Sequence, residues 1–324
     1  MRPHRIKPNH QPTVFHCTSR AVGGQFLFDE LDKQHFRDLM YKHAAFCEMK
    51  VLTHTILDNH FHIICRGPGP LKLTNEKLLA KLQAFYGPKS SQARDFQTAL
   101  RRNRPGPLAK LRERYIPRIG DLSVFFKELK QAFSRWYNKR HDRYGTLWAE
   151  RFTSAVVEDA PGVVLIVAAY VDLNSVRAGL VPDPKDYRFS GYGEALGRGG
   201  LAREGLESLW PKEWGWKKGL AEYRKLLFGE AYRAGHSKKK ALDPAAIKKV
   251  YEEGGKLSVA ELLRLRVRYF TDGVVIGTRG FVEEIFRGHY QQHVPGRKSG
   301  ARRMKGGNWG GLMSLRDLQK NVIG

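Results

Sequence analysis

The sequence predicts an α+β fold in which an antiparallel sheet is backed by helices. Along the first half of the chain, β-forming runs and helical runs follow the order strand, helix, hairpin, helix, strand, helix. Two of the β-forming runs are adjacent and joined by Asp58 and Asn59, a turn-forming pair that indicates an antiparallel hairpin. The 324 residues are 41% hydrophobic and 11% aromatic, which is enough for a buried core.

The first elements follow from alternation and from helical spacing. Residues 13–20 alternate as a strand, and Gly23 and Gly24 mark a turn. Apolar residues recur at helical spacing over residues 31–46. Residues 50–57 and 60–65 then form the two strands of the hairpin.

The next elements follow from breakers and capping residues. A helix is expected over residues 75–85, and the Gly-, Pro-, Ser- and Arg-rich stretch 87–107 is expected to be an exposed loop or linker. Asp121 is an N-cap for a helix that runs to residue 140 with one apolar and one basic side. Residues 152–157 form another strand, and a strongly apolar helix follows Pro161.

This order fits a ferredoxin-like split βαβ sheet over residues 1–196. From residue 197 onward the chain is Gly-rich and cationic, with helices expected near residues 221–233 and 257–270. We therefore expect a second region, 197–324, that is a helical, basic C-terminal extension. Its role is either an additional nucleic-acid contact surface or a helical cover with a solvated tail.

Charge indicates the class of partner. The 57 Lys and Arg residues outnumber the 32 Asp and Glu residues, giving a formal net charge of +25. Such an excess attracts phosphate polymers, so nucleic acid is the expected partner. A membrane partner is not expected, because the sequence has neither an apolar stretch of spanning length nor a basic amphipathic helix at a terminus.

Cysteine usage and the N-terminus indicate a reducing compartment. Cys17, Cys47 and Cys65 are odd in number and lack CxxC spacing, as expected of buried reduced thiols. The polar, basic residues 1–12 contain no signal-peptide pattern. A cytoplasmic location is the expectation.

Two histidines form the most specific chemical motif. A strand directs residues i and i+2 to the same side, so His60 and His62 face one way while Phe61 faces the core. Two imidazoles hold a metal poorly, so a third ligand has to come from elsewhere. In the helix after Pro161, Tyr170 and Asn174 project from one face, although a tyrosine on an apolar helix is commonly a core residue.

These residues carry a resemblance to a known family. The run LDNHFHII resembles the PNHxH signature of HUH endonucleases, and YGTLWAERF and YVDLNSVRAGLV resemble segments of the REP-associated tyrosine transposases. The three blocks occur in the family's order within residues 13–195. Asp58 and Ser175 depart from it, because the family usually has proline at both positions.

The resemblance implies roles for individual residues. His60 and His62 become metal ligands, Asn174 becomes the candidate third ligand, and Tyr170 becomes the nucleophile. The family's fold is a split βαβ sheet with the tyrosine helix laid against it. Spacing alone leaves zinc open, since imidazole suits zinc; the resemblance favours Mg²⁺ or Mn²⁺.

The implied activity is that of a metal-dependent endonuclease and strand transferase. It acts on single-stranded or hairpin DNA through a 5′-phosphotyrosine, either mobilising elements or processing REP-type repeats in a bacterial nucleoid. Both monomers and homodimers occur among relatives, so the oligomeric state stays open.

Candidate DNA-binding residues lie in or near the motif blocks, and two of them have structural alternatives. The candidates are Arg20, Trp148, Arg151 and Arg177. Trp148 is alternatively a core residue, and Arg177 alternatively caps the tyrosine helix.

Two other classes of function are alternatives to the transposase-like enzyme. The first is a protein that binds structured nucleic acid without cutting it. The second is a zinc hydrolase built on His-x-His, which needs further His or Asp ligands that the sequence does not supply convincingly.

Overall fold

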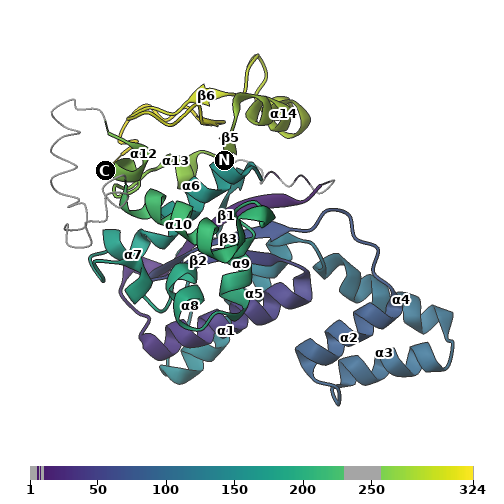
Figure 1. Ribbon diagram of the computed structural model, residues 1–324. Helices are drawn as coiled ribbons and strands as arrows, with labels where there is room; N and C mark the ends of the chain where they lie inside the picture. The colour runs from purple at the N-terminus through teal and green to yellow at the C-terminus, as the bar shows by residue number, and fades with distance from the viewer. Residues whose placement is uncertain (1–5, 7, 9–10, 230–256, 324) are drawn as a thin grey trace.

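A seven-stranded sheet forms the centre of the protein (Figure 1). The computed structural model describes all residues except 1–5, 7, 9–10, 230–256 and 324. The strand order is β2-β3-β1-β4-β5-β7-β6. The strands are β1 (Thr13–Arg20), β2 (Lys50–Ile56), β3 (His60–Gly67), β4 (Thr153–Val157), β5 (Val275–Gly277), β6 (Arg302–Arg303) and β7 (Met313–Ser314).

All neighbouring strands are antiparallel except β4 and β5, which run parallel. The mixed composition of helices and a mostly antiparallel sheet confirms the predicted α+β class. The helices are α1 (Glu30–Cys47), α2 (Asn75–Tyr86), α3 (Ser91–Arg101), α4 (Pro105–Tyr115), α5 (Leu122–Arg140), α6 (Pro161–Asp172), α7 (Asn174–Arg177), α8 (Gly191–Gly197), α9 (Gly200–Glu207), α10 (Gly215–Phe228), α12 (Val259–Leu262), α13 (Tyr269–Asp272) and α14 (Arg279–His289).

Alternation along the strands creates one core on each face of the sheet. Phe61 and Ile63 of β3 point to the face that α1 and α5 cover. Ile64, one residue further, belongs to the opposite core, which contains most of α6. His60 and His62 share the side of Ile64, so the sequence prediction that Phe61 and the two histidines face opposite ways is confirmed.

Local capping explains where the main helices begin. Asp29 and Asp32 form a capping box at the start of α1, and the Asp121 side chain accepts a hydrogen bond from the Val124 amide at the start of α5. Pro161 occupies the first turn of α6, where its missing N–H costs no hydrogen bond.

The expectation of a loop or linker over residues 87–107 is wrong. Helix α3 begins after Ser90, whose hydroxyl accepts a hydrogen bond from the Ala93 amide, and Pro105 opens α4. Serine and proline at these positions start helices instead of interrupting them. Helices α2, α3 and α4 pack together and project from one side of the sheet (Figure 1).

Two predicted C-terminal helices also differ from the structure. The expected helix over 257–270 is replaced by α12 and α13, each of four residues. The expected helix near 221–233 is α10, which begins at Gly215; residues 230–233 of that prediction lie outside the described residues.

The sheet continues across residue 197. β5 pairs with β4 through Val156 and Val275, and β7 and β6 extend the sheet further. The C-terminal region therefore contributes strands as well as helices. The predicted boundary between 1–196 and 197–324 does not coincide with an edge of the sheet.

Two further observations concern the described part of the chain. Within it, the helices are all too short or too polar to cross a bilayer. Cys17, Cys47 and Cys65 are buried thiols that form no disulfide bond, as the sequence predicts.

Candidate functional site

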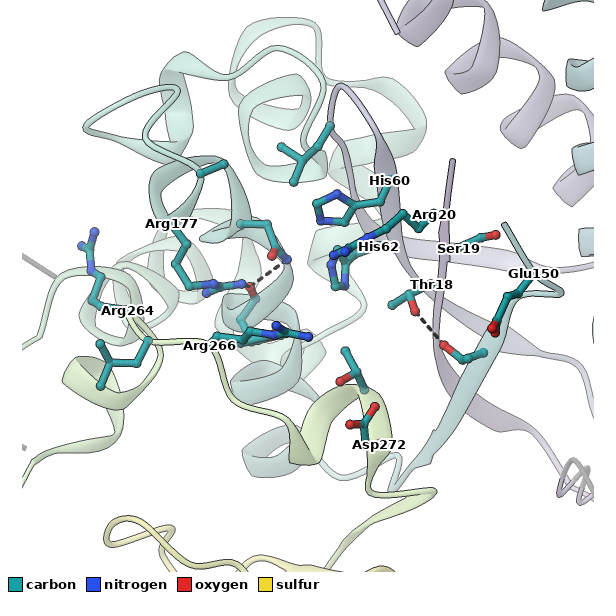
Figure 2. A pocket seen from close by; sticks show the side chains of 17 residues that line it. Thr18, Ser19, Arg20, His60, His62, Glu150, Arg177, Arg264, Arg266 and Asp272 are labelled. Carbon is teal, nitrogen blue, oxygen red and sulfur yellow. Dashed lines mark hydrogen bonds between the residues drawn. The ribbon is translucent and has the colours of Figure 1, made fainter. Parts of the chain in front are cut away.

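A cavity of about 760 Å³ opens where β1, β3, α6 and residues 264–272 meet. Figure 2 shows His60, His62 and Arg20 on one side of it and Arg177 and Arg264 on the other. The cavity is lined by Thr18, Ser19, Arg20, Leu57, His60, His62, Glu150, Thr153, Tyr170, Asn174, Arg177, Ala178, Arg264, Leu265, Arg266, Thr271 and Asp272. The structure thus brings His60, His62, Tyr170 and Asn174 to one cavity.

The register of the sheet explains why β1 lines the cavity beside β3. Arg20 lies opposite His60, and Thr18 lies opposite His62. Residues that lie opposite each other in an antiparallel pair project to the same face. Polar residues of β1 and the two histidines therefore share one side of the sheet.

His62 belongs to a hydrogen-bonded chain that fixes its tautomer. His16 Nδ1 lies 2.7 Å from the carbonyl oxygen of Phe270, which only accepts, so Nδ1 of His16 donates. Burial lowers the pKa of His16 to about 4, so its ring is neutral and its Nε2 accepts from His62 Nδ1 at 2.9 Å. His62 is left with a free lone pair on Nε2, the state that a metal ligand requires.

His60 reaches the same state through a different partner. The Asn59 side-chain nitrogen donates to the Gly24 carbonyl, which leaves Asn59 Oδ1 as acceptor for His60 Nδ1. Burial, assisted by the charge of Arg20, lowers the pKa of His60 to about 4. Burial, and to a lesser extent the neighbouring His16, also lowers the pKa of His62 well below its ordinary value. Both imidazoles are therefore neutral near pH 7 and carry their lone pairs on Nε2.

Tyr170 lies next to this pair of rings. Its ring centroid is 6.1 Å from that of His62 and 6.2 Å from that of His16. The phenol ring is 2% exposed, and the guanidinium carbon of Arg177 lies 4.0 Å from its centroid. An aromatic hydroxyl, a cation and two imidazoles consequently surround one cavity.

Arg177 holds the end of the tyrosine helix. Its guanidinium donates to the carbonyl oxygens of Tyr170 (2.7 Å) and Leu263 (2.6 Å). Burial lowers the pKa of Arg177 to about 10, which keeps it charged near neutrality. These contacts are those of a helix-capping residue, and they connect α6 to the C-terminal region.

Polar contacts with the sheet fix the position of α6. Thr53 Oγ1 donates to Asp172 and Thr55 Oγ1 donates to the carbonyl of Val171, each at 2.7 Å. Burial raises the pKa of Asp172 to about 7 despite the hydrogen bonds that it accepts. The tyrosine helix is thus attached to β2 directly beside the histidine strand.

Asn174 presents one atom that suits a metal. Its amide nitrogen donates to the carbonyl oxygens of Tyr170 (3.3 Å) and Val171 (3.1 Å). The side-chain oxygen is therefore the atom left for a ligand, and amide oxygens suit hard cations. Imidazole nitrogens and an amide oxygen are donor types that a divalent ion accepts, and His60, His62 and Asn174 all line the same cavity.

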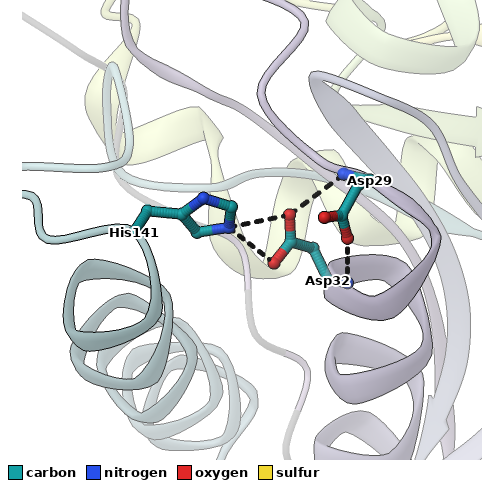
Figure 3. A group of neighbouring side chains, drawn as sticks. All are labelled: Asp29, Asp32 and His141. Atoms are coloured by element: carbon teal, nitrogen blue, oxygen red, sulfur yellow. Dashed lines mark hydrogen bonds and ion pairs between the residues drawn. The ribbon is translucent and has the colours of Figure 1, made fainter.

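Only one cluster of three His, Cys, Asp or Glu side chains with metal-like spacing occurs among the described residues, and it lies elsewhere. Asp29, Asp32 and His141 meet at the start of α1 (Figure 3). Arg140 already pairs with Asp32 at 2.6 Å and with Asp29 at 2.8 Å. Because the Arg140 guanidinium already bridges the two carboxylates, this cluster is a structural network around the capping box.

The four candidate DNA-binding residues divide into two groups. Arg20 and Arg177 line the cavity with the histidines. Trp148 and Arg151 instead line a second cavity beside α5. Trp148 is only 8% exposed and packs against Phe36, Phe61 and other core rings, as its structural alternative anticipated.

Sequence reasoning gave no role in the site to His16, Asn59 or residues 264–272. One signal was present, because His16, Thr18 and Arg20 are polar residues at alternate positions of one strand. The register of β1 against β3 was the missing information. The contact between His16 and Phe270 spans 254 positions and has no local signal.

Comparisons with known proteins give one structural similarity. No family model matches the chain, and no curated protein matches it. A solved structure that matches is a REP-associated tyrosine transposase bound to a REP hairpin. That match has a TM-score of 0.40 and 15% sequence identity, and it covers 67% of this chain and 93% of that chain.

Proposed function

We propose that this chain is a metal-dependent DNA endonuclease and strand transferase that acts on single-stranded or hairpin DNA. The observation that carries the proposal is the meeting of Tyr170 with His60 and His62, both with free Nε2 lone pairs, in one cationic cavity. The family resemblance of these residues in sequence supports the same reading. In this proposal the partner is DNA, and REP-type repeats are the natural substrates to test.

His60, His62 and Asn174 would hold the divalent ion, with Mg²⁺ or Mn²⁺ favoured over zinc by the family resemblance. When bound, the ion supplies Lewis-acid stabilisation of the charge that develops on a phosphate. The lone pairs on the two imidazoles and the Asn174 oxygen are what the chain contributes to binding it. His16 and Asn59 act as positioning residues, because each fixes the tautomer of one ligand.

Tyr170 is the nucleophile in this proposal. Its hydroxyl loses a proton and its oxygen forms a bond to phosphorus, while the bond from phosphorus to the 3′-oxygen breaks and that oxygen takes up a proton. The product is a 5′-phosphotyrosine and a free 3′-hydroxyl. Attack by a second 3′-hydroxyl reverses the step, so strands are joined without ATP. The Arg177 guanidinium lies over the face of the Tyr170 ring, with its central carbon 4.0 Å from the ring centroid.

Replacing the nucleophile tests the mechanism. Tyr170→Phe is expected to abolish cleavage and the denaturant-stable protein–DNA adduct, because the phosphotyrosine cannot form. Affinity for the same oligonucleotide should stay within about 3-fold, since the ring and its packing are retained. Labelled oligonucleotides from repeats that flank the gene are the substrates, and adducts are measured on denaturing gels. Full nicking by Tyr170→Phe rules out the covalent mechanism.

Removing the two imidazoles tests the metal site. His60→Ala combined with His62→Ala should reduce cleavage to background at every Mg²⁺ or Mn²⁺ concentration. His54→Ala is the matched control, because His54 is a buried histidine of β2 that lies outside this cavity. Metal-dependent cleavage that survives in the double variant removes the histidines from the site. If the wild-type chain binds the oligonucleotides but forms no adduct with any of them, the alternative function applies, that of a non-cleaving binding protein.

A further inference from the structure

A second cavity lies beside the first, along the exposed side of α5. It has a volume of about 810 Å³ and is bounded by α5 and residues 145–152. We call it the α5 groove. The lining residues on which the inference depends are Lys127, Gln131, Arg135, Trp148 and Arg151. The basic side of this helix is visible in the sequence, and the proposed reaction does not use it.

The α5 groove lies next to the catalytic cavity. Glu150 lines both cavities. Lys130 of α5 donates to Ser19 Oγ and to the Glu150 carbonyl oxygen, each at 2.7 Å. Because Ser19 also lines the catalytic cavity, these bonds attach the helix of one cavity to the wall of the other.

At its other end the groove reaches the helices α2–α4. Gln131 and Arg135 also line a third cavity of about 390 Å³, which includes Tyr86 of α2 and Arg114 of α4. Three adjoining cavities thus run from the catalytic histidines across α5 to the projecting helices. A polymer that extends beyond the reacting phosphate would follow such a path.

The groove presents cations that are available to a ligand. Lys127, Arg135 and Arg151 are exposed, and none of them forms an ion pair with any residue that the structure describes. Arg118 and Arg140, by contrast, are paired with carboxylates at 2.8 Å or less. Lys127, Gln131 and Arg135 are spaced four residues apart, so they form a row about 12 Å long on one helix face.

Aromatic residues accompany these cations. Trp148 and Phe152 form part of the floor of the groove. Tyr144 is 89% exposed and precedes Gly145, which lines the groove. Proteins that bind single strands combine cations, which contact the phosphate backbone, with exposed aromatic rings on which bases stack. In a duplex the faces of the bases are already stacked on each other and are not accessible to such a ring.

We propose that the α5 groove binds single-stranded nucleic acid that continues from the phosphate in the catalytic cavity. Lys127, Arg135 and Arg151 contact its phosphates, and Tyr144 stacks against a base. The inference depends on the proposed function for the position of the reacting phosphate. The groove's affinity for a single strand is measurable whether or not the chain cleaves DNA.

A charge-neutralising variant tests the groove. The triple variant Lys127→Gln, Arg135→Gln, Arg151→Gln is compared with Lys217→Gln, Arg279→Gln, Lys320→Gln, which removes three exposed cations from outside the three cavities. Both are made in a Tyr170→Phe background, and a fluorescent oligothymidylate of about 20 nucleotides is titrated in EDTA. Under these conditions neither cleavage nor metal contributes, so failure of the proposed reaction does not affect the result.

The groove variant is expected to lose about 10- to 100-fold in affinity at about 0.1 M NaCl, because it loses phosphate contacts. Each lost contact also reduces the slope of log affinity against log salt concentration by about 0.7. The control variant should lose less than about 3-fold in affinity, since it changes only the overall electrostatic potential of the protein, which salt screens. Tyr144→Ser, which changes no charge, should weaken the oligothymidylate about 5-fold or more and leave a mixed-sequence duplex unaffected.

Two results overturn the proposal. Equal losses in the groove and control variants show that the affinity comes from overall charge. Equal losses for the single strand and the duplex in the groove variant show that the groove holds double-stranded nucleic acid.

Discussion

At the scale of single residues, the histidines of the site have two different roles, although they lie on the neighbouring strands β1 and β3. His60 and His62 keep free lone pairs, whereas His16 uses both ring nitrogens, one on the Phe270 carbonyl and one on His62. A ligand held in this way stays in one tautomer and one orientation. The role of His16 is therefore to position His62.

Replacing His16 tests that role. His16→Leu should raise the metal concentration for half-maximal cleavage about 10- to 100-fold, because His62 loses the acceptor that holds its Nδ1 proton. The rate at saturating metal should fall much less, since the ligands themselves remain. Metal titrations of cleavage measure both quantities. His54→Leu is the control, because His54 is a buried histidine outside the three cavities. An equal shift in that variant would assign the effect to general destabilisation.

His54 is a buried histidine with a different consequence. It lies on β2 and is 0% exposed, and neither ring nitrogen forms a hydrogen bond with a described residue. A carboxylate oxygen of Glu194 lies 3.6 Å from its Nε2. Burial, assisted by the charge of Arg37, lowers its pKa to about 3. In the unfolded chain the ring takes up a proton near its ordinary pKa of about 6.5. Between these values the unfolded state binds more protons, so stability falls as the pH falls.

Removing that proton site should flatten the pH dependence of stability. At pH 4.5 the wild-type chain is expected to lose about 3 kcal/mol of its free energy of unfolding through His54 alone, at about 1.4 kcal/mol for each pKa unit. His54→Phe keeps a ring of similar size and should lose about 3 kcal/mol less than wild type between pH 7 and 4.5. Urea unfolding at both values measures the difference. Identical losses in the two proteins would show that His54 does not titrate on unfolding.

At the scale of elements, periodicity and capping residues predicted those parts of the fold that carry the site. β1, the β2–β3 hairpin, α1, α5 and α6 all follow from residue alternation, helical spacing or a cap. Helices α3 and α4 do not follow from these signals. Ser90 and Pro105 lie in a stretch whose composition predicts a loop, although both start helices here. Whether serine or proline begins a helix or ends one depends on the residues that the next turn buries, such as Phe96.

The candidate site also has a part that local sequence patterns predict and a part that they do not. Spacing alone placed His60 and His62 on one face, and helical spacing paired Tyr170 with Asn174. The side of the cavity formed by residues 264–272 had no such signal, because it reaches the histidines only through the packing of α13 against β1 and β4. Tertiary contacts between distant segments set that part of the site.

At the scale of the whole molecule, the two predicted regions are connected through the site itself. β5 continues the sheet from β4, Phe270 accepts the hydrogen bond of His16, and Leu263 accepts one from Arg177. Residues after 197 therefore support the geometry of the histidines and of the tyrosine helix. Such extensive contact favours a single cooperative unit over two separate domains.

Unfolding with a residue-level probe tests this cooperativity. Ile276 of β5 is 0% exposed, so Ile276→Ala should cost about 2–5 kcal/mol by leaving a cavity. In one cooperative unit, the amides of β1 and β3 lose as much protection as those of β5 and α14, because all of them open together. Hydrogen exchange followed by mass spectrometry across a urea series measures each segment, and an exposed substitution such as Arg279→Gln serves as the control. A loss of protection confined to residues after 197 would instead show that the chain consists of two independent domains divided where the sequence predicted.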